Sequence, residues 1–286
     1  MKRVPDRSAF VKALRLTGSL IPGDNLKTFI YLNLIAKPRT WARKWASGFY
    51  RTEMVYSILG EFRSTYKGPF SILELGTANG YSFNKMLHAT RYMKMDDNVV
   101  CHAFDSFEGL RPPTDKEDAG LVSNDWKEGT YKGNYEILKE HCEKKGYRNF
   151  RIHKGYFEDT INQKLVESLK DTPPMLVWVD CDYYKPALHA FKELLPILPS
   201  GCVFYFDDFE FNYGSKFTGE ARLVDEVNRG LHGPDIELIR DLSLGLDSRS
   251  VYRFINYAEN SPRYERKAVP EWEGNPRPIG NGSPFP

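Results

Sequence analysis

Short, mostly apolar runs alternate with amphipathic segments through the middle of the chain. Five such runs, each bounded by turn residues, are Ser71–Leu75, Val99–Phe104, Phe150–His153, Met175–Val179 and Cys202–Phe206. Runs of this length without strict polar alternation are typical of parallel strands that are buried on both faces of a sheet. The pattern therefore predicts five parallel strands.

Between these runs the hydrophobic residues recur at helical spacing. One stripe repeats at intervals of three and four residues and consists of Ala187, Leu188, Phe191, Leu194, Leu195 and Leu198. A second set repeats every four residues and consists of Ile161, Leu165 and Leu169. Such stripes predict amphipathic helices. Strands that alternate with helices predict a parallel sheet joined by right-handed crossovers.

The pattern changes after the fifth run. A last helix is expected near Thr218–Leu231, and two further strand-like runs follow at Ile236–Arg240 and Val251–Ile255. Their connection contains Gly245 and Asp247, so a closing antiparallel hairpin is expected. The predicted fold class is therefore α/β, with a mostly parallel sheet of seven strands, helices on both faces and an antiparallel C-terminal hairpin.

The chain is expected to have three parts. Residues 1–66 mix aromatic and basic residues and predict a helical N-terminal extension, whereas residues 67–257 carry the alternating strands and helices. Residues 258–286 are rich in proline and glycine and are expected to be mostly irregular. Aromatic residues also gather in the segment Phe107–Tyr131, and we expect this segment and residues 1–66 to form a lid over a ligand.

Composition narrows the class of protein. The 40 basic residues nearly balance the 38 acidic residues, so the net charge of +2 gives no basis for binding nucleic acid or an anionic membrane. No apolar run approaches the roughly 20 residues needed to span a bilayer, and no secretory signal is recognisable. The four cysteines form no CxxC pair, so we expect reduced packing residues in a cytoplasmic protein.

The first predicted strand ends in a glycine-containing turn. The run Glu74-Leu75-Gly76-Thr77-Ala78-Asn79-Gly80 precedes a helix that is expected to begin near Tyr81. Gly76 would let the backbone turn sharply and approach a ligand without a side chain in the way, and Gly80 would do the same at the helix entrance. The spacing differs from the G-x-G-x-x-G of pyrophosphate sites and suits an uncharged nucleoside with an amino-acid arm.

The second predicted strand ends at Asp105. An acidic residue at this position accepts hydrogen bonds from the ribose hydroxyls in dinucleotide-binding folds, whereas the alternative is a simple cap for the following turn. Ligands of open α/β sheets bind outside the carboxyl ends of the strands, where the Gly76 turn also lies. Together the two features favour a nucleoside cofactor.

Aspartates follow the fourth and fifth predicted strands directly, as Asp180-Cys181-Asp182 and Asp207-Asp208. Adjacent parallel strands lie about 4.8 Å apart, so these carboxylates should converge at one edge of the sheet. Clustered carboxylates repel one another unless a cation lies among them. Oxygen ligands favour Mg²⁺, with Mn²⁺ or Ca²⁺ as alternatives. The competing interpretation is one aspartate that caps a helix while the others are solvated.

Four ordered motifs carry a resemblance to a known family. They are Asp-Ser-Phe-Glu-Gly-Leu from Asp105, Gly-Tyr-Phe-Glu-Asp-Thr from Gly155, Val-Asp-Cys-Asp-Tyr-Tyr from Val179, and Phe-Asp-Asp-Phe from Phe206. In order and composition they resemble the macrocin O-methyltransferase (TylF-like) family, over roughly residues 73 to 255. The resemblance implies a class I methyltransferase (Rossmann-like) fold and Mg²⁺-dependent methyl transfer from S-adenosylmethionine to sugar hydroxyls of natural products.

The resemblance also implies residue roles. The implied metal ligands are Asp180, Asp207 and Asp208. The implied cofactor contacts are Glu74, Gly76, Asp105 and Ser106, with Tyr156 and Phe157 near the adenine. The chain departs from the family at Cys181, where glycine is common, at Tyr184–Pro186, which lacks the usual Glu-Ser-Thr, and in a longer insertion after Leu110. These departures leave the acceptor open.

Methyl transfer to a hydroxyl needs a proton acceptor and a positioned oxygen. A divalent ion would lower the pKa of the hydroxyl, and Asp180 or Asp182 is expected to take its proton. The acceptor is expected to be a small molecule and not nucleic acid. No membrane span is expected, and a homo-oligomer is compatible with the sequence.

Three alternatives stay open at this point. Asp180-Cys181-Asp182 also resembles the Asp-x-Asp motif of metal-dependent glycosyltransferases. The same metal site would serve a phenol or catechol O-methyltransferase. A non-catalytic protein of the same fold is the third alternative, although intact carboxylates argue against it.

Overall fold

The computed structural model describes residues 26, 34, 54–114, 116–119, 127–244 and 250–258. The chain divides into two compact units, Met1–Arg51 and Thr52–Pro286, and the fold described below belongs to the second. Most of the predicted N-terminal extension, the predicted tail and the hairpin connection at Gly245 and Asp247 lie outside the described residues. Within the described part of the chain, no helix is long and apolar enough to cross a membrane.

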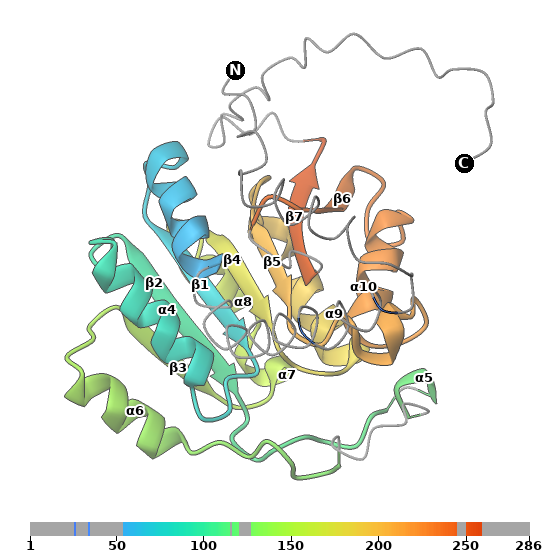
Figure 1. Ribbon diagram of the computed structural model, residues 1–286, viewed down its shortest axis with the longest axis horizontal. Coiled ribbons are helices and arrows are strands. Elements are labelled where there is room, and N and C mark those ends of the chain that lie inside the picture. The colour runs from blue at the N-terminus through green and yellow to red at the C-terminus, as the bar shows by residue number, and fades with distance from the viewer. Residues whose placement is uncertain are drawn as a thin grey trace, which may run out of the picture. The chain divides into compact units, whose positions relative to one another are not determined.

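Seven strands form one sheet in the order β3-β2-β1-β4-β5-β7-β6 (Figure 1). The strands are β1 (Phe70–Leu75), β2 (Val99–Asp105), β3 (Phe150–Lys154), β4 (Pro174–Val179), β5 (Val203–Phe206), β6 (Ile236–Arg240) and β7 (Val251–Asn256). The first five are parallel, whereas β7 pairs antiparallel with both β5 and β6. The predicted mostly parallel sheet and its antiparallel C-terminal hairpin are confirmed.

The helices connect these strands and lie on both faces of the sheet (Figure 1). Besides an unlabelled helix over residues 54–65, they are α4 (Tyr81–Tyr92), α5 (Lys116–Ala119), α6 (Tyr135–Lys144), α7 (Phe157–Thr160), α8 (Gln163–Ser168), α9 (Tyr184–Leu194) and α10 (Gly219–Asn228). The last helix is shorter than the predicted span of 218–231, because its C-cap lies at Arg229.

One predicted helical stripe is divided between two helices. Ile161 is the C-cap of α7, and the side chain of Asn162 accepts hydrogen bonds from the N–H groups of Lys164 and Leu165 at the start of α8. An asparagine that caps a new helix favours a break in the chain direction. The residues from Ile161 to Leu169 therefore belong to two short helices, although they recur every four residues. The prediction of a single helix from this spacing is wrong.

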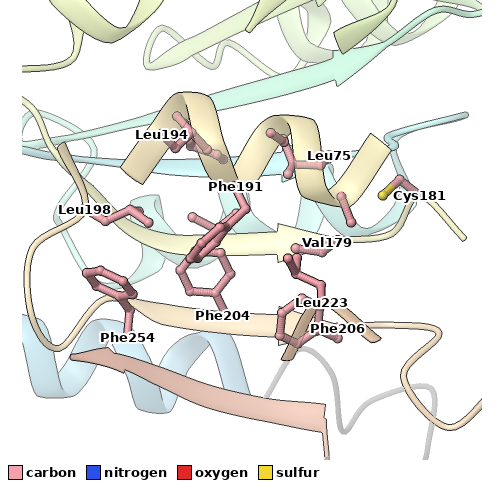
Figure 2. Close-up of a cluster of buried hydrophobic side chains, with 14 of the residues drawn as sticks. Leu75, Val179, Cys181, Phe191, Leu194, Leu198, Phe204, Phe206, Leu223 and Phe254 are labelled. Atoms are coloured by element: carbon pink, nitrogen blue, oxygen red, sulfur yellow. The ribbon is translucent and has the colours of Figure 1, made fainter. Parts of the chain in front are cut away.

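The sheet separates two apolar layers, because side chains alternate between the faces of each strand. On one face, α9 and α10 contribute Phe191 and Leu223, which pack with Val179, Phe204 and Phe206 (Figure 2). On the other face, the helix of residues 54–65, α4 and α6 pack on a second cluster of buried side chains. Every residue of β1 and β4 is buried, which explains why both sequences are mostly apolar.

All four sequence cysteines are buried free thiols. Cys101 lies in β2, Cys142 in α6, and Cys202 directly before β5, while Cys181 follows β4. Each belongs to one of the two apolar clusters. The prediction that they are packing residues is confirmed.

The carboxyl ends of four neighbouring strands are held at one level. The N–H of Gly76 donates to Phe104 O at 2.9 Å, that of Asp180 to Leu75 O at 2.8 Å, and that of Asp207 to Val179 O at 2.9 Å. Each bond extends a strand pairing by one residue. The chain segments that leave β1, β4 and β5 therefore begin side by side.

Gly76 is the point of closest approach at this edge. Its φ is 92°, and a Cβ placed on it would lie 1.8 Å from the backbone oxygen of Asp180. Both the left-handed conformation and the contact exclude a side chain. Glycine is thus required at position 76 by the neighbouring β4 chain.

We expect Gly76→Ala to destabilise the protein more than Gly146→Ala does. Gly146 also has a positive φ of 66°, but a Cβ there would meet nothing within 4 Å. The control should lose about 1 kcal/mol from backbone strain, and Gly76→Ala about 1–3 kcal/mol more from the overlap. Urea unfolding measures both losses. Equal losses would contradict the steric explanation.

Candidate active site

The glycine turn connects β1 to α4 as predicted, since α4 begins at Tyr81. Gly80 is the N-cap of α4, with a φ of 75° and a ψ of 27°. A Cβ on Gly80 would lie 2.2 Å from Cδ1 of Leu138 in α6. The two glycines are thus required by packing against Asp180 and Leu138, a reason that the sequence prediction of ligand approach did not include.

Asp105 ties two loops of this edge together. Its Oδ2 accepts the N–H of Ala78 at 2.7 Å, and its Oδ1 accepts the N–H of Phe107 at 2.6 Å. Ala78 and Phe107 both have positive φ, which is unfavourable for residues with a side chain. The carboxylate therefore stabilises a strained glycine turn and the turn after β2 at the same time. The neighbouring Ser106 accepts the N–H of Glu108 at 3.1 Å.

The two residues predicted near an adenine have different surroundings. Tyr156 is half-buried, donates its hydroxyl to Glu108 at 2.5 Å, and carries the guanidinium of Arg111 2.9 Å from its ring centre. Phe157 is buried in the apolar cluster with Phe104. Tyr156 is thus a partly exposed aromatic side chain with Arg111 on one face of its ring, while Phe157 is part of the core.

Glu74 is a carboxyl group inside the sheet. Its side chain is fully buried, and among the described residues neither carboxyl oxygen has a hydrogen-bond partner of good geometry. Burial raises the pKa of Glu74 to about 8; the hydroxyls of Ser82 and Thr77 act to lower it, and the charges of Asp105 and Asp207 raise it further. A buried polar group without a partner is unfavourable and calls for an explanation.

The predicted metal ligands come together. One carboxylate oxygen from each of Asp180, Asp207 and Asp208 lies within 4.8 Å of the other two. Burial is the largest cause that raises the pKa of Asp180 well above its usual range, followed by the charges of Asp207 and Asp208. The hydroxyl of Tyr205 donates to Oδ1 of Asp207 at 3.0 Å, which helps to fix that carboxylate.

Asp182 lies on the same turn after β4. Its side chain is buried and its φ is 64°, a conformation that aspartate tolerates better than most residues. Burial, followed by the charges of Asp208 and Asp207, raises the pKa of Asp182 to about 8. Backbone strain of this kind clusters at functional sites. A buried carboxyl with a pKa near neutrality has the proton affinity of a general base.

Two further acidic residues at this edge were not predicted from the sequence. Glu220, in the first turn of α10, accepts the N–H of Asp208 at 3.1 Å through Oε2. Asp118, in α5, accepts the N–H of Tyr184 and the N–H of Gly219, both at 2.8 Å. Neither residue follows a strand directly. The expectation that residues after parallel strands meet at one edge of the sheet therefore could not identify them.

The segment Phe107–Tyr131, expected to form part of a lid, is closed at its base. The N–H of Leu110 donates to Thr130 O at 2.9 Å, and the N–H of Gly129 donates to Leu110 O at 2.8 Å. Between these ends, Asp118 contacts the starts of α9 and α10. Its middle, including Trp126, lies outside the described residues. The lid itself stays a prediction.

Comparisons with known proteins agree with this architecture. Residues 73–209 match a protein family described as a methyltransferase domain. The structure of the O-methyltransferase NovP is similar, with a TM-score of 0.55 and 17% identity over 72% of this chain and 79% of that chain. The structure of CalS11, a calicheamicin methyltransferase, has a TM-score of 0.53 and 17% identity over 91% of this chain and 95% of that chain. No curated protein matches the chain in sequence.

The structural similarities identify the fold, and the family match identifies the residues that resemble a known domain. The two structural likenesses show that the seven-stranded sheet has the Rossmann-like methyltransferase fold. The family match runs from the middle of β1 to just after β5 and includes all the residues predicted for the site. Residues 73–209, a little under half of the chain, are therefore similar to a methyltransferase domain, and the sheet has the fold of one.

We expect Glu74→Gln to flatten the fall in stability of the ligand-free protein with rising pH. The pKa of Glu74 is raised from 4.5 to about 8, so the folded protein binds the proton more tightly than the unfolded chain. The stability from this group is complete below its unfolded pKa and is lost as pH rises through 8. The free energy of unfolding should therefore fall less in the variant between about pH 6 and about pH 9.

Urea unfolding at several pH values measures this difference. Glu143→Gln, at an exposed position of α6, is the matched control and should follow the wild type. Identical pH profiles for Glu74→Gln and wild type would show that Glu74 is ionised in the folded protein over the whole range.

Proposed function

We propose that the chain is an S-adenosylmethionine-dependent O-methyltransferase that uses a divalent metal ion, Mg²⁺ in the first place, to methylate a hydroxyl of a small molecule. The observation that carries this proposal is the convergence of the Asp180, Asp207 and Asp208 oxygens within 4.8 Å. They lie at the same edge of a methyltransferase domain as the Gly76 turn and Asp105. One edge thus offers groups for a cofactor and for a cation.

The residues at the glycine turn suit S-adenosylmethionine, which supplies an activated methyl group on a sulfonium. Each oxygen of Asp105 accepts one backbone N–H, and a carboxylate oxygen has a second lone pair free for a ribose hydroxyl. The buried carboxyl of Glu74 would favour the positive charge of the cofactor. Gly76, Gly80 and Ser106 would shape the turn around it, and Tyr156 would face the adenine with Phe157 behind.

The carboxylates after β4 and β5 suit a divalent cation. Their mutual repulsion raises the pKa of Asp180, and a cation among them would reverse this effect. Three carboxylate oxygens form a hard donor set that matches Mg²⁺, Mn²⁺ or Ca²⁺. When bound, such an ion supplies Lewis acidity toward an acceptor hydroxyl.

Asp182 is the proposed proton acceptor. It lies next to the ion-binding carboxylates yet outside the trio that the geometry groups together. Its burial would keep water from competing for the proton, and its interaction with Asp208 supports a place close to an acceptor hydroxyl held by the ion. Asp180 would then serve as a ligand, with Asp182 as the base.

A sugar hydroxyl is the proposed acceptor. The motifs at Asp105, Gly155, Val179 and Phe206 resemble the macrocin O-methyltransferase family. NovP is named an O-methyltransferase and CalS11 a calicheamicin methyltransferase, which supports small-molecule O-methylation. The methyltransferase domain favours methyl transfer over glycosyl transfer.

A panel of acceptors tests this assignment. The protein, S-adenosylmethionine and Mg²⁺ are incubated with nucleotide-linked sugars, glycosylated natural products and catechols, and S-adenosylhomocysteine release is measured. Methylation of a sugar is expected. If only catechols are methylated, the proposed acceptor is a phenol and not a sugar. If the protein instead transfers the sugar from a nucleotide sugar, the proposal of methyl transfer is wrong.

We expect Asp105→Ala to weaken the binding of S-adenosylhomocysteine by about 1–3 kcal/mol, because the ribose hydroxyls lose their acceptor. Calorimetry measures the affinity. Because Asp105 also holds Ala78 and Phe107, the 2′-deoxy analogue of the ligand is the control. The loss should be smaller for the analogue. An equal loss for both ligands would assign the whole effect to loop structure.

We expect chelation to stop methyl transfer and Mg²⁺ to restore it, while the affinity for S-adenosylhomocysteine changes little. The cation would lie over β4 and β5, whereas the cofactor groups come mainly from β1 and β2. Asp207→Asn should lower turnover by orders of magnitude, because positioning supplies much of the rate. Asp97→Asn, exposed at the opposite edge of the sheet, is the control. Full turnover in excess chelator would remove the metal from the mechanism.

A further inference from the structure

Glu220 is a buried carboxyl beside the proposed ion site. Only 1% of its surface is exposed, and its Oε2 accepts the N–H of Asp208 at 3.1 Å. Its other oxygen, Oε1, is buried, and no donor in the described part of the chain makes a hydrogen bond with it. The hydrogen bond to Asp208 therefore explains the burial of Oε2, but nothing described so far explains the burial of Oε1.

The backbone fixes Glu220 in this place from two sides. A Cβ on Gly219 would lie 3.3 Å from the backbone oxygen of Asp182, so the first residue of α10 lies against the turn after β4. The N–H of Gly219 donates to Asp118 at 2.8 Å. The next residue, Glu220, is therefore held beside the turns that carry Asp182 and Asp208.

The start of a helix does not explain a carboxylate in this position. The gain from a negative charge at a helix N-terminus is smaller than the cost of a buried group whose hydrogen bond is left unmade. The charges of Asp208, Asp180, Asp207 and Asp182 all act on Glu220 in the unfavourable sense. A cation among these carboxylates would remove the conflict.

We infer that Glu220 is a fourth carboxylate of the divalent-ion site, with Oε2 holding the backbone of Asp208 and Oε1 directed to the cation or to a water bound to it. The inference rests on the proposed function, because that proposal places the cation. Glu220 lies beyond the matched residues 73–209 and is contributed by α10.

Calorimetric titration of the full chain with Mn²⁺, in the presence of S-adenosylhomocysteine, tests the inference. Glu220→Gln keeps an oxygen for the Asp208 N–H but removes the charge, and we expect Mn²⁺ affinity to fall about 10- to 100-fold. Asp225→Asn, on the same helix and paired only with the largely exposed Arg229 in the contacts described, should leave the affinity unchanged.

A second measurement separates ion binding from a purely structural role. Without divalent ions, Glu220→Gln should melt at the same or a higher temperature than wild type, because repulsion is relieved. With Mn²⁺, it should gain less than wild type gains. A lower melting temperature without ions, together with unchanged Mn²⁺ affinity, would overturn the inference.

The remaining outcomes are equally distinct. If the affinity falls only in Glu220→Ala, which also loses the acceptor for the Asp208 N–H, Glu220 positions Asp208 and is not part of the ion site. If the wild type itself binds no Mn²⁺, the metal part of the proposed function fails first. If wild type binds Mn²⁺ and Glu220→Gln binds it equally well, only the role of Glu220 fails.

Discussion

The site depends on backbone hydrogen bonds that continue one residue beyond the parallel strands. Through them the N–H groups of Gly76, Asp180 and Asp207 donate to carbonyls at the carboxyl ends of β2, β1 and β4. The chain leaves each strand at the same level, and whatever residue follows the strand projects at the same edge. Without this alignment, carboxylates that are distant in the sequence would not share one site.

The alignment also brings several carboxyl groups close together, and the folded structure must compensate for their burial and repulsion. Glu74, Asp180, Asp182 and Glu220 are all removed from water to a large extent. Burial is the largest cause that raises the pKa of each, and the charges of neighbouring carboxylates raise it further. Burial of like charges opposes folding unless other interactions compensate for it. The compensation is available in the two apolar layers, since β1 and β4 are buried along their whole length. The buried centre of the sheet thus holds carboxyl groups whose own burial opposes folding.

Much of this arrangement could be predicted from the sequence, because the features in question are local. Strands buried on both faces have continuous apolar runs, and the residue after such a run lies at the carboxyl edge. This reasoning located Asp105, Asp180, Asp207 and Asp208. It could not separate the two interpretations of Asp105, since a carboxylate with two oxygens is able to hold the turns and still accept further hydrogen bonds.

What the sequence did not predict is tertiary in origin. Glu220 reaches the site only because α10 begins against the turn after β4, and Asp118 only because its segment returns to the starts of α9 and α10. The break at Asn162 was hidden by a regular spacing of apolar residues, whereas the cap that causes it is polar. The packing reason for Gly76 required knowledge that β1 and β4 are neighbours.

Asp118 has a consequence for how such a domain can diversify. A single carboxylate accepts the first N–H groups of α9 and α10, and the base of its segment is closed by Leu110 and Thr130. The exposed positions Pro112 and Thr114 lie between Leu110 and Asp118 and hold neither helix start in place. Exchanges there would change the surface beside the proposed site while the carboxylates and the sheet stay where they are, so the proposed acceptor could differ between chains that share one fold.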